Sequence, residues 1–228
     1  MDETKTKLKA EFIENRGYWS SFWDDVLELD ETFFSAYSKF SSIPSKNNAL
    51  SPKIREFIYI AIDASTTHLY LPGLKLHMEN ALALGATRDE IMEVLELTSV
   101  LGIHTCTLGV PILIEELRDL GRSDEIDEIE YGEYEKGLKE TFKKNRGYWS
   151  PFWDDMLRLS PDFFECYLDF SSVPWNSGTL EPKVKEFIYI AIDTATTHLH
   201  KEGARIHIRN ALKHGASKEE IMEVFQCV

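Results

Sequence analysis

The sequence predicts an all-α protein built from two tandem copies of one helical domain. Several segments recur at a constant offset of 130 residues, and no window shows the period-two alternation of a β-strand. NRGYWSSFWDD (15–25) returns as NRGYWSPFWDD (145–155), and EFIYIAIDASTTHL (56–69) returns as EFIYIAIDTATTHL (186–199). About half of the aligned positions are identical and no insertion is needed. A period this long indicates a duplicated domain and not a solenoid unit.

Apolar spacing and end signals predict which segments of each copy are helical. Trp19, Phe22, Trp23 and Val26 occupy positions i, i+3, i+4 and i+7, which lie on one helix face. A later helix is expected to stop at Gly85, because glycine commonly ends helices. The other helix starts are marked by a capping residue or by Pro in the first turn, at Asp30 and Ser160, Pro52 and Pro182, and Thr87 and Ser217.

The repeat and the charge pattern divide the chain into a first helical repeat (1–120), an acidic connector (121–137) and a second helical repeat (138–228). The stretch 115–137 contains ten acidic and three basic residues, so it carries half of the net charge of −14. The second repeat reaches only Val228, the equivalent of position 98, so we expect it to lack the last helix of the first repeat. Either a shortened chain or a partner subunit that fills the gap would account for this.

The composition excludes several classes of protein. With 39 acidic against 25 basic residues the chain repels phosphate backbones, so no nucleic-acid partner is expected. Three cysteines and an N-terminus without an apolar leader predict a cytoplasmic location. The longest uncharged run, 97–114, is too short and too polar to predict a membrane span. The apolar face of 221–225 would be exposed in a single chain, which favours a homo-oligomer, a dimer or trimer of two-repeat chains.

Two acidic residues lie in an otherwise apolar helix of each copy. Glu56, Asp63 and Thr67 fall within about 40° of one another on a helical wheel, and Glu186 and Asp193 repeat the acids. So narrow a polar stripe predicts a buried cavity or interface, where a carboxylate must be paired or must have a raised pKa. The carboxylates are therefore candidates for proton transfer, and a structural ion pair with a neighbouring helix is the alternative.

Two histidines recur in each copy with the same spacing. His68 and His77 return as His198 and His207, and imidazole exchanges protons near neutral pH. All four are predicted as catalytic candidates, and the alternative is that they are satisfied core residues. Two histidines and two carboxylates could ligate a metal, but the His-x8-His spacing differs from the i, i+3 and i, i+4 pairs of helical metal sites. No metal and no cofactor are predicted.

Three pairs of equivalent residues are predicted to hold a small-molecule substrate. The arginines could grip a substrate carboxylate, and surface capping is the competing interpretation. The tryptophans could line a pocket for a ring-shaped ligand, although their spacing is also that of an ordinary core. The pairs are Arg16 and Arg146, Trp19 and Trp149, and Tyr70 and His200.

The pattern PKxxEFIYIAID…THL…GxxxHxxNALxxGATxxEIMEVL resembles the carboxymuconolactone decarboxylase family and the related alkylhydroperoxidase D-like proteins. The similarity covers 50–121 and 180–228, and the His-x-x-x-Ala-Leu-x-x-Gly block within it occurs twice. The resemblance implies a small all-α domain that assembles into ring-like trimers or hexamers. A chain with two such domains would resemble a pseudo-oligomer built into one polypeptide.

Two activities belong to the proteins that the chain resembles. The decarboxylases act on a carboxylated muconolactone in aromatic degradation, by proton transfer without a cofactor. The peroxidase-like members use Cys-x-x-Cys, with the second Cys four residues before the motif His. Those positions hold Tyr70 and Gly73 in one copy, and His200 and Gly203 in the other. Without these thiols a dithiol peroxidase has no mechanism here.

The resemblance therefore implies a cofactor-free carboxy-lyase. His77 and His207 would be the proton donors or bases, oriented by the carboxylates of the acidic stripe, with His68 and His198 assisting. A peroxiredoxin-type activity is an alternative that would rest on the family resemblance alone. A non-catalytic ligand-binding oligomer is the other alternative, and it predicts a fully packed core where a catalyst needs a cavity.

Overall fold

The computed structural model describes residues 3–127, 130–176 and 178–228, and every regular element in them is a helix. The predicted all-α class is confirmed. Residues 128 and 129 of the predicted acidic connector lie outside the described residues. The first part of the chain forms α1 (Glu3–Arg16), α2 (Phe22–Leu29), α3 (Glu31–Ser41), α4 (Ile43–Asn47), α5 (Pro52–Ala64), α6 (Leu71–Ala83), α7 (Arg88–Ser99), the 3-10 helix η1 (Val100–Ile103) and α8 (His104–Asp119).

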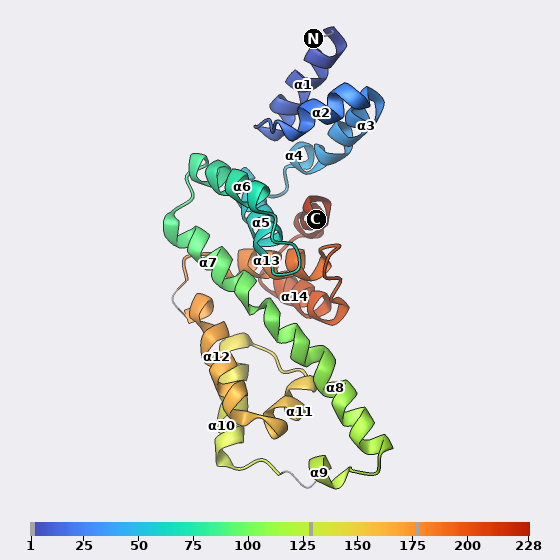
Figure 1. Ribbon diagram of the computed structural model, residues 1–228. Helices are drawn as coiled ribbons and strands as arrows, with labels where there is room; N and C mark the ends of the chain where they lie inside the picture. The colour runs from blue at the N-terminus through green and yellow to red at the C-terminus, as the bar shows by residue number, and fades with distance from the viewer. Residues whose placement is uncertain (1–2, 128–129, 177) are drawn as a thin grey trace.

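The second part of the chain repeats the order from α1 to α7, except that α12 spans the equivalents of both α3 and α4. It forms α9 (Asp124–Asp127), α10 (Glu133–Arg146), α11 (Phe152–Leu159), α12 (Pro161–Asn176), α13 (Pro182–Thr194), α14 (Lys201–Lys213) and α15 (Lys218–Cys227). The molecule is elongated, with α1 to α3 at one end, α10 to α12 toward the other, and the α5–α7 and α13–α15 helices between them (Figure 1).

The predicted helix ends follow from local chemistry. Asp30 accepts a hydrogen bond from the backbone N–H of Phe33 and so caps α3. Thr87 and Ser217 form capping boxes with Glu90 and Glu220. The prediction that Trp19 shares a helix with Phe22 and Trp23 is wrong, because α2 begins only at Phe22. Gly17 adopts a φ of +80° after α1, and the chain from Tyr18 to Ser20 is not helical.

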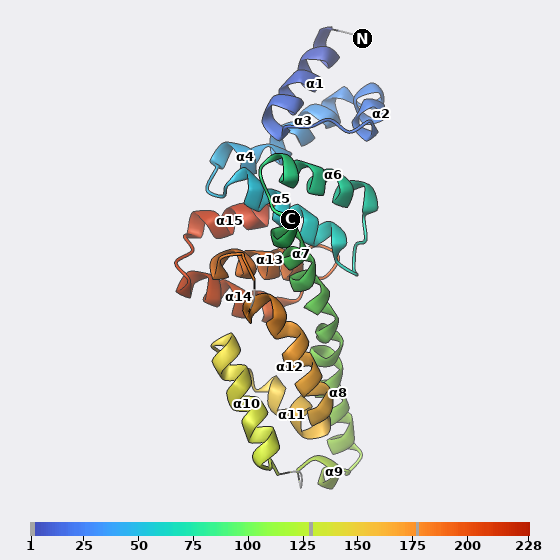
Figure 2. The same cartoon turned by 90° about the vertical axis from the view of Figure 1, so that its left-hand side faces the viewer.

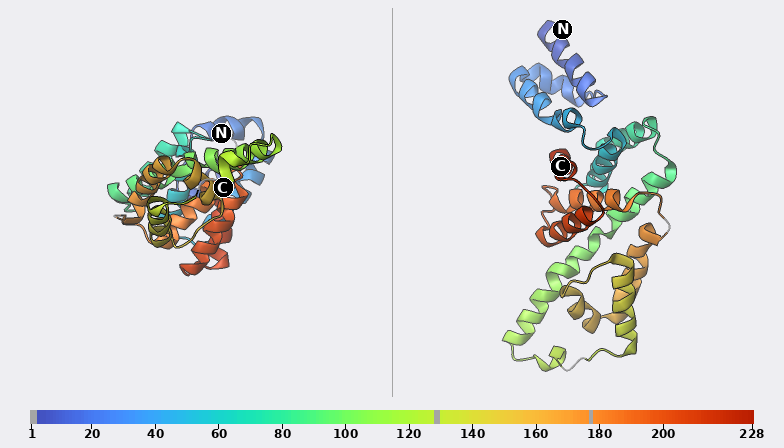
Figure 3. Two further views of the ribbon diagram at one scale, coloured as in Figure 1. Left: turned by 90° about the horizontal axis from the view of Figure 1, so that it is seen from below. Right: turned by 180° about the vertical axis from the view of Figure 1, so that it is seen from behind.

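The centre of the molecule is a core shared by the two repeats. Helices α5 and α13 pack against each other, and α7 packs against both of them. Phe57 and Ile188, one from each repeat, are fully buried in the same cluster. Viewed from behind, α13 to α15 lie beside α5 and α7 and above α10 to α12 (Figure 3). The repeats therefore fold as one body and not as two beads on a string.

Two buried ion pairs join the repeats reciprocally. Lys185 Nζ lies 2.8 Å from Glu93 Oε1, and Arg55 Nη1 lies 2.8 Å from Glu223 Oε1. Lys185 is the equivalent of Arg55, and Glu223 is the equivalent of Glu93. Each repeat thus supplies the cation of one pair and the acid of the other. This is the pattern of an isologous dimer interface, realised within one chain.

Helix α8 breaks the symmetry between the repeats. It continues α7 and η1 away from the first repeat and runs beside α11 of the second, while α12 packs against α7 (Figure 2). Ile103 and Cys106 there pack into the aromatic cluster that holds Trp153, which is 4% exposed. Within the described residues α2, the equivalent of α11, has no such cover, and its Phe22 is 58% exposed. The two copies therefore differ most in what covers their aromatic helix.

One helical stretch, Arg88–Asp119, is long and apolar enough to cross a membrane by length and composition alone. Its first part, α7, lies in the shared core, where Val94 and Leu97 are fully buried. The core helix of a soluble protein passes the same test, so the stretch is weak evidence for a span.

Replacing Lys185 by Met should lower the free energy of unfolding by about 3–5 kcal/mol, because Glu93 is left buried without its cation. The double variant Lys185→Met/Glu93→Gln should recover part of this loss, since a neutral amide can still accept the backbone N–H of Leu180. Urea denaturation measures both values. Lys75→Ala, which removes an exposed pair with Glu79 at 3.9 Å, is the control and should cost less than about 1 kcal/mol. Equal effects of Lys185→Met and Lys75→Ala would contradict the role of the buried pair.

Candidate functional site

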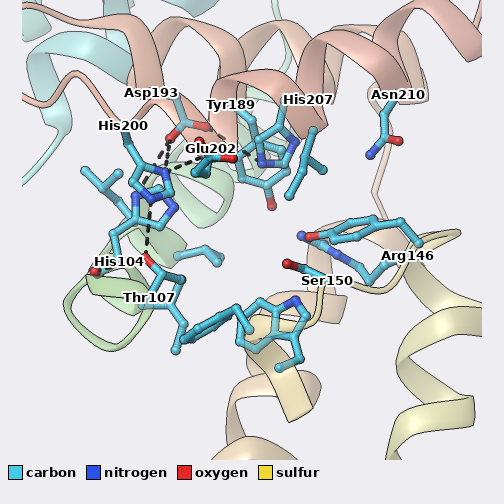
Figure 4. A pocket seen from close by; sticks show the side chains of 18 of the residues that line it. His104, Thr107, Arg146, Ser150, Tyr189, Asp193, His200, Glu202, His207 and Asn210 are labelled. Atoms are coloured by element: carbon cyan, nitrogen blue, oxygen red, sulfur yellow. Dashed lines mark hydrogen bonds and ion pairs between the residues drawn. The ribbon is translucent and has the colours of Figure 1, made fainter. Parts of the chain in front are cut away.

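A cavity of about 500 Å³ lies in the second repeat, between α13, α14, the loop after α10, and α8 (Figure 4). Four chain segments meet there because α8 of the first repeat closes over the second. The lining includes five of the residues that the sequence predicted, namely Arg146, Trp149, Asp193, His200 and His207. The structure thus brings together most of the second-repeat set in one hollow.

His207 and Glu186 form a buried pair behind the cavity wall. His207 Nδ1 lies 2.6 Å from Glu186 Oε2, and Asn210 Nδ2 donates to Glu186 Oε1 at 3.3 Å. Since a carboxylate only accepts, the histidine carries its proton on Nδ1, and its Nε2 is left toward Asp193, 4.0 Å from Oδ2. The Tyr189 ring lies tilted against the imidazole, with 4.5 Å between the ring centroids. This arrangement fixes one tautomer and presents one ring nitrogen for proton exchange.

Arg146 lies on the side of the cavity away from His104 and His200 (Figure 4). It is the last residue of α10, where it donates to the backbone oxygen of Ser171 at 3.1 Å and lies over the Tyr189 ring. Burial opposes its charge, but Tyr189 and neighbouring tyrosines hold the pKa of Arg146 above its ordinary value. Among the described residues no carboxylate pairs with it. A part-buried cation without an acidic partner is suited to bind an anionic ligand.

Three imidazoles and a carboxylate gather at the other side of the cavity. His104 Nδ1 lies 2.6 Å from His198 Nε2, and His200 Nδ1 lies 3.7 Å from Asp193 Oδ1. Burial lowers the pKa of His104 to about 3, with the neighbouring imidazoles acting in the same direction. Burial also lowers the pKa of His198. Both rings are therefore neutral at pH 7, with lone pairs available.

The first repeat holds the equivalent pair, which is also buried but has no α8 beside it. His77 Nδ1 lies 2.7 Å from Glu56 Oε2, and the Arg16 guanidinium donates to the hydroxyl of Tyr59 at 3.1 Å. Burial raises the pKa of Asp63. His68 and Tyr70 are exposed, and His68 Nε2 lies 3.6 Å from Asp63. Thr67, expected on the acidic stripe, lies beyond the end of α5 and is exposed.

Sequence reasoning missed several residues of the second-repeat site. Tyr189 and Asn210 belong to the recurring EFIYIAID and HxxNAL segments, so the repeat contained a signal that was not read as a site. His104 and Thr107 come from α8, and no repeat marks them because their equivalents would lie beyond Val228. Their contact with His198 and His200 spans more than 90 residues of sequence.

The comparisons with known proteins identify the family of the chain. The family model described as the carboxymuconolactone decarboxylase family matches residues 31–102 and 161–226. The chain belongs to the carboxymuconolactone decarboxylase family. It is also similar to a crystal structure from Burkholderia xenovorans LB400, provisionally named a gamma-carboxymuconolactone decarboxylase subunit, with 47% identity and a TM-score of 0.93 over 98% of this chain and 89% of that one. No curated protein matches the chain.

Glycine occupies the second cysteine position of the related peroxidase-like proteins in both copies of this carboxymuconolactone decarboxylase family member. A Cβ at Gly203 would collide with Asp193 Oδ2 and with the ring of His200. A Cβ at Gly73 would collide in the same way with Asp63 and Tyr70. The close approach of the carboxylate therefore requires glycine and leaves no room for a thiol.

Gly203→Ala should destabilise the protein by about 1–3 kcal/mol, because the added methyl group must push the buried Asp193 aside. Thermal or urea unfolding measures the change. Gly137→Ala is the matched control: that glycine is also helical, but nothing lies within 4 Å of its added Cβ, so the substitution should be neutral or should stabilise by about 0.5–1 kcal/mol. Destabilisation by Gly137→Ala alone would contradict the steric argument.

Proposed function

We propose that the chain is a carboxymuconolactone decarboxylase-like lyase that acts on a small carboxylated substrate in the cavity of the second repeat. The observation that carries this proposal is the cavity itself, which has the Arg146 cation on one side and the Glu186-held imidazole of His207 in its wall. The name of the Burkholderia relative points to the same reaction class. A fully packed core, expected of a purely structural module, is not what this repeat has.

Binding of the substrate falls to Arg146. A substrate with two carboxylates would place the one that is retained against the guanidinium, because gripping the departing carboxylate would stabilise the ground state and slow the reaction. The departing carboxylate would then lie against the ring of Trp149, which lines the cavity. Burial raises the pKa of Tyr148 to about 12, so its hydroxyl is neutral and does not add charge. An apolar wall disfavours the carboxylate relative to neutral CO2.

The proton transfer falls to His207. The bond between the carboxylate carbon and the ring carbon breaks, CO2 leaves, and the electron pair is delocalised over the unsaturated lactone as a dienolate. The protonated imidazole then delivers its Nε2 proton to carbon, and Glu186 on the opposite ring nitrogen stabilises the cationic form that donates. Asp193, 4.0 Å from Nε2, is placed to assist in returning the proton. This step needs no cofactor.

His207→Gln should lower the rate of CO2 release from carboxymuconolactone by about 10²–10⁴-fold, because glutamine can bond Glu186 but cannot donate a proton to carbon. Turnover of the purified full chain measures this. The matched control is His77→Gln, which makes the same change in the first repeat and should retain most of the activity, since α8 does not cover that site. Unchanged turnover in His207→Gln would overturn the catalytic assignment, and equal losses in both variants would overturn the restriction to the second repeat.

We also propose that the chain forms a homo-oligomer in the cytoplasm, a dimer or trimer of two-repeat chains. Apolar side chains on α8 and on the uncovered α2 support this, since Leu108 is 69% exposed and Phe22 is 58% exposed. Sedimentation equilibrium should return a multiple of the 26.3 kDa chain mass. Replacing Leu108 with Lys should shift the distribution toward smaller species, and a single-chain mass for the unaltered protein would contradict the proposal.

A further inference from the structure

The three histidines of a cluster beside the cavity have no role in the proton transfer proposed for His207, in which only the aspartate of the cluster assists. Its members are His104, Asp193, His198 and His200, and one donor atom of each lies within 4.8 Å of the others. They come from three elements, the start of α8, the end of α13 and the turn before α14. Figure 4 shows His104, Asp193 and His200 grouped on the side of the cavity away from Arg146.

The spacing of the donor atoms is close to that of a metal site. His104 Nδ1 and His200 Nδ1 each lie 3.7 Å from Asp193 Oδ1, and His104 Nδ1 lies 2.6 Å from His198 Nε2. Ligands of a tetrahedral zinc ion, each about 2.0–2.1 Å from the metal, lie about 3.3 Å from one another. Changes of up to about 1.5 Å in these separations would therefore bring the donor atoms into a coordination sphere.

Hydrogen bonds from neighbouring groups orient the candidate ligands, as they do for the ligands of known metal sites. Thr107 Oγ1 lies 3.3 Å from His200 Nε2, so this hydroxyl can hold the ring with Nδ1 toward Asp193. The backbone N–H of His200 donates to the carbonyl oxygen of Asp193 at 2.7 Å and ties the turn to α13. The ligands are thus attached to helices and to each other.

Asp193 supplies an independent observation. Its side chain is 3% exposed, and Oδ2 is buried without a hydrogen-bond partner among the described residues. A buried carboxylate oxygen without a partner is costly unless a cation or a proton compensates it. The imidazoles of His104, His198 and His200 lie beside it and offer ring nitrogens to such a cation. A cation between the four side chains would satisfy the carboxylate.

The first repeat provides an internal comparison. Its equivalent positions hold Asp63, His68 and Tyr70, and the described residues contain no equivalent of His104. Tyrosine in place of His200 removes one imidazole, and the missing α8 equivalent removes another. The first repeat therefore offers two ligands where the second offers four.

We propose that His104, Asp193, His198 and His200 bind one divalent transition-metal ion, such as Zn²⁺, beside the cavity of the second repeat. Imidazole nitrogens with one carboxylate oxygen are a ligand set of the kind that such ions prefer. An ion that accepts a fifth ligand would present that position to the cavity, opposite Arg146. The sequence predicted no metal from the His-x8-His spacing, and His104 and Asp193 meet only through the fold.

The test uses the full chain after treatment with a chelator. Titration with Co²⁺, followed by visible absorption, and with Zn²⁺, followed by calorimetry, should give one ion per chain. His200→Tyr places the first-repeat residue in the second repeat. This variant and the separate variant His104→Gln should each weaken the affinity for the metal ion by at least about 100-fold. Circular dichroism checks that both variants keep their helices.

Two controls make the result specific. His214→Leu removes an exposed histidine and inserts the residue that the first repeat has at this position, so metal affinity should not change. His207→Gln should also keep the ion, which separates metal binding from the proton-transfer proposal. The inference is overturned if the unaltered chain binds no stoichiometric ion, or if His200→Tyr and His104→Gln bind it as tightly as the unaltered chain does.

Discussion

The reciprocal ion pairs between the repeats are the constraint on which the rest of the structure depends. Lys185 with Glu93, and Arg55 with Glu223, are buried where an unpaired charge would be costly, so each repeat completes the other's core. Once the repeats are held in this way, α7 lies across α13. Its continuation, α8, must then leave the first repeat beside the second, which is where His104 reaches the cavity.

The result is one ancestral set of side chains in two environments. Both copies keep the imidazole–carboxylate pair, at 2.7 Å for His77 and 2.6 Å for His207, and both keep an arginine among tyrosines. Only the second copy is covered by α8, and Trp153 is buried there. Coverage excludes water and strengthens every electrostatic interaction inside the cavity. The two sites therefore differ in whether α8 covers them, while both keep the same imidazole–carboxylate pair.

Much of the fold could be predicted from the sequence, because the repeat, the caps and the prolines are local signals. Pro52 and Pro182 open α5 and α13 as expected, and Thr87 and Ser217 cap α7 and α15. Of the site, the pairing of His207 with Glu186 followed from a polar stripe on an apolar helix. What could not be predicted is the role of His104, since no local pattern specifies that a helix of one repeat covers the other.

Both copies have other residues at the two positions that hold thiols in related peroxidase-like proteins. Glycine at 73 and at 203 is common to both copies, and in each it lets the acid of the preceding helix approach closely. Glycine is needed at both positions because a Cβ there would collide with the aspartate carboxylate. The first position differs, with an exposed Tyr70 in the open copy and His200 beside His104 and Asp193 in the covered one. The imidazole of His200 also contacts His104 and Thr107, which α8 supplies, so the residue at this position and the covering helix contribute to the same site.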